Sequence, residues 1–238
     1  MPRSKFRASP SGYTSDLNDR MTRKKHVVFS RRRWLWFDPY IRHYVRKRVH
    51  QVLVDGSLPQ YDKVLHVIMA QHVSRFDGFI IRMIQRSTAP SARLITIMLD
   101  EQIKRNPVFK KAGALGITPG SLASVRRLKQ TVASEMKGGD YLVIFPQGRI
   151  ETVDADPHDI QEGYRHLVHP LLPTHFIPVA LSVEALTHPK PSIFVRIGDP
   201  AGVDEARGAF ADTVSGLRRW LRSEGESADT AWPGRRVL

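Results

Sequence analysis

The 238-residue sequence contains no cysteine. Disulfide bonds, thiolate metal sites and catalysis by a cysteine nucleophile are therefore excluded together. Long hydrophobic runs are also missing, since no stretch approaches the roughly 20 consecutive apolar residues of a membrane-spanning helix. The Lys- and Arg-rich N-terminal region lacks the apolar segment of a secretory signal. The length of the chain predicts one main domain, and the missing spanning and signal segments predict a protein that stays in the cytoplasm.

Acidic residues are scarce relative to basic ones, with 23 Asp and Glu against 37 Lys and Arg, for a formal net charge of +14. Most of this excess lies in residues 1–50, which contain fourteen Lys and Arg but only Asp16, Asp19 and Asp38 as acidic residues. Such a concentration predicts an anionic partner for this region. Membrane phospholipid and nucleic acid are the two candidates.

The N-terminal region divides into two parts. Residues 1–30 have no apolar period, which predicts a disordered basic arm. Residues 31–55 place apolar side chains at helical spacing opposite basic ones, which predicts an amphipathic helix at a membrane interface. Its expected interface residues are Arg31, Arg32, Arg33, Trp34, Trp36 and Phe37. A helix that packs on the core with its basic side in water would produce the same pattern.

Residues 56–222 alternate short apolar runs with longer helical patterns, which is typical of an α/β domain. We expect a central, mostly buried sheet flanked by helices. The expected strands span 64–70, 94–98, 141–145, 176–182 and 193–197, and the expected helices 78–86, 101–111, 125–136, 164–172 and 210–221. Pro107 is expected to kink or divide the second helix. Residues 223–238 are expected to form a polar tail.

A histidine and an aspartate lie where the first of these strands ends and a helix begins. The segment QHVSRFDG at 71–78 places His72 five residues before Asp77. If a turn brought them together, Asp77 would accept a hydrogen bond from one imidazole nitrogen, and the other nitrogen could take a proton from an alcohol. Such a pair needs no protein nucleophile. A capped helix start beside a structural histidine would have the same spacing.

Two further segments end strands with residues suited to a binding site. In FPQGR at 145–149, Gly148 permits close backbone approach, Gln147 can hydrogen-bond a hydroxyl and Arg149 can pair with a phosphate. The loop GITPGS at 116–121 opens onto a basic helix and could bind an anion at the helix N-terminus. An ordinary turn and a simple connection would explain these two segments as well.

Taken in order, these segments resemble the glycerolipid acyltransferase family of the lysophosphatidic acid type. The family's first block is a His, four residues and an Asp, usually preceded by Asn and with Ser two positions after the His; here it is QHVSRFD at 71–77. The third block, usually Phe-Pro-Glu-Gly-Thr-Arg, resembles FPQGRI at 145–150, and the fourth, an apolar strand with an embedded Pro, resembles FIPVA at 176–180. The resemblance covers residues 64–197, and the combination of blocks is more specific than any one block.

The resemblance implies an O-acyltransferase in which His72 deprotonates an acceptor hydroxyl and Asp77 orients the imidazole. The acceptor oxygen would attack the thioester of acyl-CoA or acyl carrier protein directly, without a further cofactor. The residues expected to bind substrate are Ser74, Arg75, Thr118, Gly120, Arg126, Phe145, Pro146, Gln147, Gly148 and Arg149. The expected partners are a lipid acceptor and an anionic membrane surface, and the expected location is the inner face of the cell membrane.

Two departures from the family pattern concern acceptor binding. The second block normally ends in an Arg, but the corresponding stretch here is ITPGS, with no Arg before Arg126. In the third block Gln147 replaces the usual glutamate, and Arg149 stands one place before the expected Arg. A lysophospholipid such as 1-acylglycerol-3-phosphate and a neutral acceptor such as a glycolipid or carotenoid glycoside therefore both stay open.

Other classes of function fit parts of the sequence. A nucleic-acid-binding protein would explain the basic N-terminus, although no familiar nucleic-acid-binding motif is visible. A hydrolase would use His72 and Asp77 to activate water or Ser74, but Ser74 is not in a G-x-S-x-G elbow. An inactive family member would act as a membrane adaptor. No metal is expected, because the histidines and Asp77 have none of the recognised ligand spacings.

Overall fold

The computed structural model describes residues 31–60, 63–111 and 113–238, with the side chains of 31–36 and 111 outside that description. The arm predicted for residues 1–30 therefore lies outside the described residues. So do the side chains of five of the six residues expected at a membrane interface, which are Arg31, Arg32, Arg33, Trp34 and Trp36.

Helices and strands alternate along most of the described chain, as the sequence predicts. The helices are α2 (Arg31–Arg46), α3 (Asp77–Thr88), α4 (Asp100–Arg105), α5 (Pro107–Lys111), α6 (Leu122–Glu135), η1 (Glu162–Leu167), α7 (Ala206–Glu224), η2 (Gly225–Ser227) and α8 (Ala228–Ala231). The strands are β1 (Gln51–Asp55), β2 (Leu65–Ala70), β3 (Leu94–Leu99), β4 (Leu115–Ile117), β5 (Tyr141–Ile144), β6 (Thr174–Glu184), β7 (Ser192–Ile197) and β8 (Arg235–Arg236). Pro107 divides the second predicted helix into α4 and α5.

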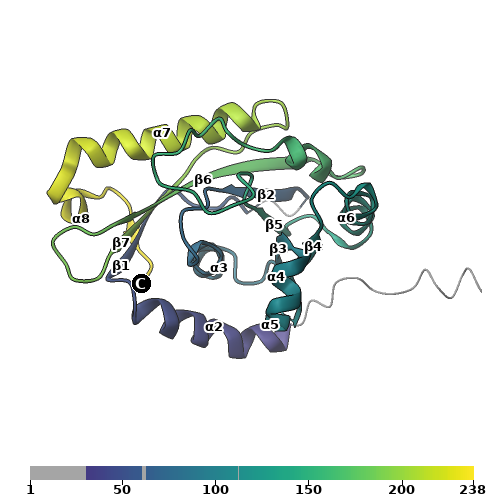
Figure 1. Ribbon diagram of the computed structural model, residues 1–238, viewed down its shortest axis with the longest axis horizontal. Coiled ribbons are helices and arrows are strands. Elements are labelled where there is room, and N and C mark those ends of the chain that lie inside the picture. Colours follow the sequence, from purple (N-terminus) through teal and green to yellow (C-terminus); the bar gives the residue numbers. More distant parts are fainter. Residues whose placement is uncertain (1–30, 61–62, 112) are drawn as a thin grey trace, which may run out of the picture.

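The strands form one mixed sheet in the order β4-β3-β5-β2-β6-β7-β1-β8. The five strands from β4 to β6 are parallel, β7 is antiparallel to β6 and parallel to β1, and β8 is antiparallel to β1. In Figure 1, α7 lies along one side of this sheet and α2 and α3 lie on the other. The predicted class, a central sheet flanked by helices, is confirmed for the described residues.

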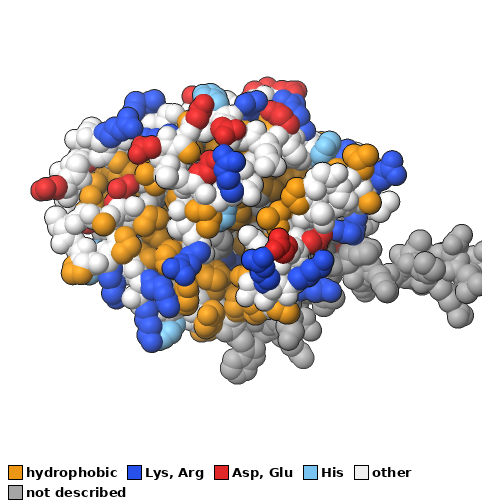
Figure 2. All heavy atoms as spheres, viewed as in Figure 1, with side chains coloured by type: hydrophobic (Ala, Val, Ile, Leu, Met, Phe, Trp, Pro, Cys, Tyr) orange, Lys and Arg blue, Asp and Glu red, His pale blue; other side chains and the backbone are white. Residues whose placement is uncertain are grey.

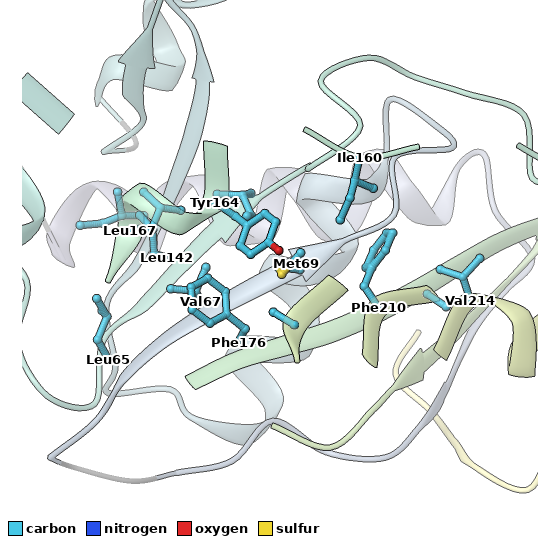
Figure 3. Close-up of a cluster of buried hydrophobic side chains, with 14 of the residues drawn as sticks. Leu65, Val67, Met69, Leu142, Ile160, Tyr164, Leu167, Phe176, Phe210 and Val214 are labelled. Carbon is cyan, nitrogen blue, oxygen red and sulfur yellow. The ribbon is translucent and has the colours of Figure 1, made fainter. Parts of the chain in front are cut away.

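Two apolar clusters, one on each face of the sheet, make up the core. On one face, Ile41 and Val45 of α2 and Ile80 and Ile84 of α3 pack against the strands. On the other face, residues from α6, η1 and α7 pack against the alternate strand side chains. Figure 3 shows part of this second cluster, in which Tyr164 lies close to Met69 of β2, Phe176 of β6 lies beside Val67 of β2, and Phe210 comes from α7. Because both faces are covered, β2 is buried along its whole length.

The predicted helix 31–55 is too long. Helix α2 ends at Arg46, and Gln51–Asp55 form strand β1, which pairs in parallel with β7. The error has a physical cause: Val45, Val49 and Val52 happen to continue a helical spacing, whereas Val52, Leu53 and Val54 are all buried, as in a strand covered on both faces.

The C-terminal part of the chain also differs from expectation. The predicted helix 164–172 is a shorter 3₁₀-helix that ends at Leu167, because Pro170 and Pro173 follow closely. In place of a polar tail, residues 225–236 form η2, α8 and β8. Trp232 is buried against Trp220 and Phe194, with ring centroids 4.7 and 5.3 Å away. Among the described residues, no helix is long and apolar enough to cross a membrane.

Candidate active site

Two neighbouring parallel strands bring the predicted motifs together. β2 ends at Ala70 and β5 ends at Ile144, and the two strands pair with Met69 opposite Ile144. The carboxyl ends of parallel strands meet at one edge of a sheet, so residues 71–77 and 145–151 become neighbours. The backbone N–H of Glu151 donates to the carbonyl oxygen of His72 at 2.9 Å, which joins the two loops directly.

His72 and Asp77 form the pair that the sequence predicts. The Nδ1 atom of His72 lies 2.8 Å from Oδ2 of Asp77, whose side chain is fully buried at the first position of α3. The loop between them makes the turn that a regular helix would not allow. The imidazole stacks on Phe145 with ring centroids 4.3 Å apart, which fixes its plane. Within the described part of the chain, no hydrogen bond occupies Nε2.

Asp77 is held by the whole loop. Its Oδ2 atom also accepts hydrogen bonds from the backbone N–H groups of Val73 and Ser74, both at 2.8 Å. The hydroxyl of Ser74 donates to Oδ1 at 2.5 Å. A carboxylate only accepts, so Nδ1 donates to it, and in the neutral form of the imidazole the lone pair is then on Nε2. Ser74 therefore acts here by holding Asp77, and its hydroxyl is engaged.

Gln147 contacts the same histidine from the other loop. It is buried, its Oε1 accepts from the backbone N–H of His72 at 2.6 Å, and its Nε2 donates to Oε2 of Glu151 at 3.0 Å. Gly148 has φ +74°, and a Cβ atom there would lie 2.4 Å from Nε2 of Gln161. The tight turn after β5 thus depends on glycine at this position.

His72 lines a pocket of about 540 Å³, a volume typical of small-molecule sites. Its lining is mostly apolar and includes Phe37 of α2, Phe79 of α3, Met98 of β3, Phe109 of α5 and Ile117 of β4. Five predicted site residues besides His72 line it: Arg75, Phe145, Pro146, Gly148 and Arg149. On the face of the molecule that Figure 2 shows, hydrophobic side chains are exposed in the central part, and Lys and Arg side chains lie around them.

Four arginines line the pocket, and they differ in their partners. Arg82 pairs with Asp38, Arg105 with Glu101, and Arg149 with Glu151 at 2.7 Å. Arg75 is exposed and, as far as the described residues go, has no carboxylate partner; its guanidinium lies 5.8 Å from the ring centroid of Phe76. Tyr164 also lines the pocket, and burial raises its pKa, so it stays a neutral phenol.

Thr118, Gly120 and Arg126, also predicted as site residues, are not among the residues that line the pocket. Thr118 donates its hydroxyl to Asp100 at 2.7 Å, Gly120 occupies a turn with φ +74°, and Arg126 is exposed on α6. The N-terminus of α6 is capped by Ser121, which accepts a hydrogen bond from the backbone N–H of Ser124. Phe37, expected at a membrane interface, contacts Phe79 and lines the pocket.

Sequence reasoning missed Glu151 and the apolar pocket wall from β3 and α5. The spacing of Glu151, four residues after Gln147, was a signal that could have been noticed. The wall has no local signal, because its residues also fit ordinary core positions. No group of three or more potential metal ligands occurs among the residues that the structure describes.

The α/β fold thus places the His–Asp pair beside an apolar pocket. The family model "Acyltransferase" matches residues 51–182, more than half of the chain, and the chain belongs to this family. The match runs from β1 into β6 and includes both loops of the site. The protein is thus an acyltransferase-family enzyme.

A search of the curated proteins finds no match. Among the solved structures that match is the 1-acyl-sn-glycerophosphate (LPA) acyltransferase PlsC from Thermotoga maritima. The two chains are 14% identical, the alignment covers 79% of this chain and 78% of the other, and the TM-score is 0.48.

Proposed function

We propose that this enzyme transfers a fatty acyl group from a thioester donor, acyl-CoA or acyl carrier protein, onto a hydroxyl group of a lipid. The observation that carries the proposal is the 2.8 Å contact between His72 Nδ1 and Asp77 Oδ2 beside an apolar pocket. It supports a role for His72 as a base because Nε2 keeps a lone pair. An apolar pocket of this kind suits a hydrocarbon chain.

In the proposed reaction, Nε2 of His72 takes the proton of the acceptor hydroxyl while that oxygen attacks the thioester carbonyl. A C–O bond forms, the C–S bond breaks, and the proton passes from the imidazolium to the leaving thiolate. Asp77 holds the imidazole in the required tautomer and stabilises its positive charge. No covalent acyl-enzyme forms, which agrees with the absence of cysteine and the engagement of Ser74.

Arg75 is the residue that we assign to an anionic headgroup of the acceptor or to a donor phosphate. It is exposed, lines the pocket and lies in the loop between His72 and Asp77. Arg149 is less suited, because a phosphate would have to displace Glu151. The neutral side chains Thr96, Gln102 and Asn106 also line the pocket and suit hydroxyl groups of the acceptor.

The experiment is transfer of radiolabelled palmitoyl-CoA into a total lipid extract, with the products identified by mass. The His72→Ala variant is the blank, and His166→Ala, at an exposed histidine on η1, is the matched control. We expect label in one lipid class with wild type and His166→Ala only. Label in phosphatidic acid would identify a lysophospholipid acceptor, and label in a glycolipid or carotenoid ester a neutral one. No His72-dependent product with either acyl-CoA or acyl carrier protein as donor would refute the proposal.

A further inference from the structure

The loop after β5 contains a largely buried carboxylate, that of Glu151, which lies outside the predicted site motifs. The side chain of Glu151 is only 9% exposed. Its backbone N–H donates to the carbonyl oxygen of His72, and its Oε2 atom accepts from Nε2 of Gln147. Since Oε1 of Gln147 accepts from the backbone N–H of His72, these three residues form a closed ring of hydrogen bonds. Both peptide groups that flank the Cα atom of His72 take part in it.

Glu151 decides which way the amide of Gln147 faces. A carboxamide has an accepting oxygen on one side and a donating NH₂ group on the other, whereas a carboxylate only accepts. With Glu151 at 3.0 Å, the NH₂ group must face Glu151 and the oxygen must face the N–H of His72. Because Gln147 is buried, an amide without this partner would leave a polar group unsatisfied.

The other carboxylate oxygen of Glu151 holds a pocket residue. Oε1 accepts from Nε of Arg149 at 2.8 Å and lies 2.7 Å from its terminal nitrogen. The Arg149 side chain is 71% exposed, so without this contact it would be free to move. Asp159 lies farther from the same guanidinium, at 3.6 Å. The carboxylate of Glu151 therefore orients both Gln147, which contacts the main chain of His72, and Arg149, which lies at the rim of the pocket.

We propose that Glu151 is a positioning residue: it fixes Gln147, and through Gln147 the main chain of His72, and it holds Arg149 at the pocket rim. In this chain position 147 is an amide and the carboxylate stands at position 151. The ring of hydrogen bonds belongs to the chain itself. Its effect on the rate of acyl transfer rests on the proposed function.

An exchange of the two side chains offers a direct test. In the double variant Gln147→Glu/Glu151→Gln, the new carboxylate still accepts from the N–H of His72, and the new amide donates to it and accepts from Arg149. The single variant Gln147→Glu places two carboxylates at hydrogen-bonding distance, and Glu151→Ala leaves the amide of Gln147 without its acceptor. Glu162→Ala removes an exposed carboxylate on η1 and is the matched control.

The first readout is hydrogen–deuterium exchange of the His72 amide, followed by NMR, which needs no substrate. We expect exchange about tenfold faster or more in Glu151→Ala and in Gln147→Glu, and exchange near the wild-type rate in the double variant and in Glu162→Ala. The second readout is kcat and KM with palmitoyl-CoA and 1-acylglycerol-3-phosphate, or with the acceptor that the labelling experiment identifies. We expect kcat to fall about tenfold or more in the two single variants, with a smaller change in KM, and to recover in the double variant.

Two results would overturn the inference. One is wild-type exchange and kcat in Glu151→Ala; the other is a double variant that is no better than Gln147→Glu, since the exchanged pair should rebuild the ring. If a single variant is too unstable to assay, the double variant is compared with wild type: near-wild-type exchange and kcat support the inference, and a tenfold loss overturns it. Failure of the proposed function would look different, because the wild-type protein itself would then transfer no acyl group.

Discussion

Asp77 is the residue on which the geometry of the site depends. It begins α3, where the helix dipole favours a negative charge, and it accepts four hydrogen bonds from the loop 72–74. The five-residue separation from His72 therefore works through a loop that wraps around the carboxylate. A change at Asp77 disturbs both the tautomer of His72 and the conformation of the loop.

Replacing Asp77 with Asn tests this dependence. The amide can present a donor to Nδ1 and stabilise the wrong imidazole tautomer, so we expect kcat to fall by about 10²- to 10⁴-fold while some activity remains. The measurement is acyl transfer kinetics together with circular dichroism to confirm folding. A folded Asp77→Asn variant with wild-type kcat would show that the carboxylate does not orient the base.

Tyr141 gives a residue-level prediction about pH and stability. Burial raises its pKa to about 12 from the usual 10, and its hydroxyl donates to the carbonyl oxygen of Pro59. A raised pKa in the folded state means that the stabilisation is complete below pH 10 and is lost as the pH rises towards 12. We therefore expect the free energy of unfolding to fall between pH 10 and 12, by up to about 1.4 kcal/mol per pH unit.

The control for Tyr141 is Tyr141→Phe, which has no ionisable hydroxyl. Urea unfolding at several pH values should give a flatter dependence for this variant above pH 10. Equal slopes for the two proteins would contradict a buried, protonated Tyr141.

At the scale of elements, α2 forms one wall of the pocket, and ion pairs join it to α3. Asp38 of α2 accepts from Nε and the terminal nitrogen of Arg82 at 2.8 and 2.9 Å, and Arg86 lies 3.1 Å from it. The Arg82 side chain is 6% exposed and also donates to Gln85. The same helix contributes Phe37 to the pocket. Movement of α2 would therefore change the pocket as well as the surface.

Replacing Asp38 with Ala should destabilise the protein by about 3 kcal/mol, because a buried guanidinium loses its bidentate carboxylate. Urea unfolding measures this change. The control is Glu101→Ala, which breaks the exposed pair with Arg105 and should cost less than about 1 kcal/mol. Equal losses in the two variants would argue against α2 being held by the Asp38 pair.

The sequence predicts the helices and strands better than it predicts the contacts between residues far apart in the chain. Strand–helix alternation and the division at Pro107 are visible in local patterns, and the His72–Asp77 contact lies within one loop. By contrast, the local pattern predicts helix where β1 lies and gives no role to Glu151, because both depend on residues far away in the chain. β1 acquires its strand conformation by pairing with β7, about 140 residues later, and Glu151 acquires its role by meeting His72.

At the scale of the whole molecule, the sheet joins segments from both ends of the described chain. β1 lies between β7 and β8, so residues 51–55 contact residues 235–236. The site lies elsewhere in the sheet, after β2 and β5, and α2 contributes Phe37 and Ile41 to the pocket lining. Exposed basic residues on α2 and directly after it include Arg42, Arg46 and Lys47, which suits an anionic surface beside the pocket.

Binding of the whole protein to membranes is the corresponding prediction. We expect co-sedimentation with vesicles that contain anionic phospholipid and weaker binding of Arg42→Gln/Arg46→Gln/Lys47→Gln, by about 1 kcal/mol for each charge removed. The control is Arg126→Gln/Lys129→Gln on α6, which should bind nearly as wild type does. If the α2 variant binds as tightly as wild type, α2 is not the membrane-binding element. Tight binding to an oligonucleotide instead of vesicles would favour a nucleic-acid partner.

The central claim is that His72 acts as the general base of direct acyl transfer. The most direct measurement is the kcat of a folded His72→Ala variant beside wild type, with labelled palmitoyl-CoA and the acceptor found in the lipid extract. We expect a loss of about 10²- to 10⁴-fold in kcat, with no labelled protein at any time point. A His72→Ala variant that folds and turns over at the wild-type rate would contradict it.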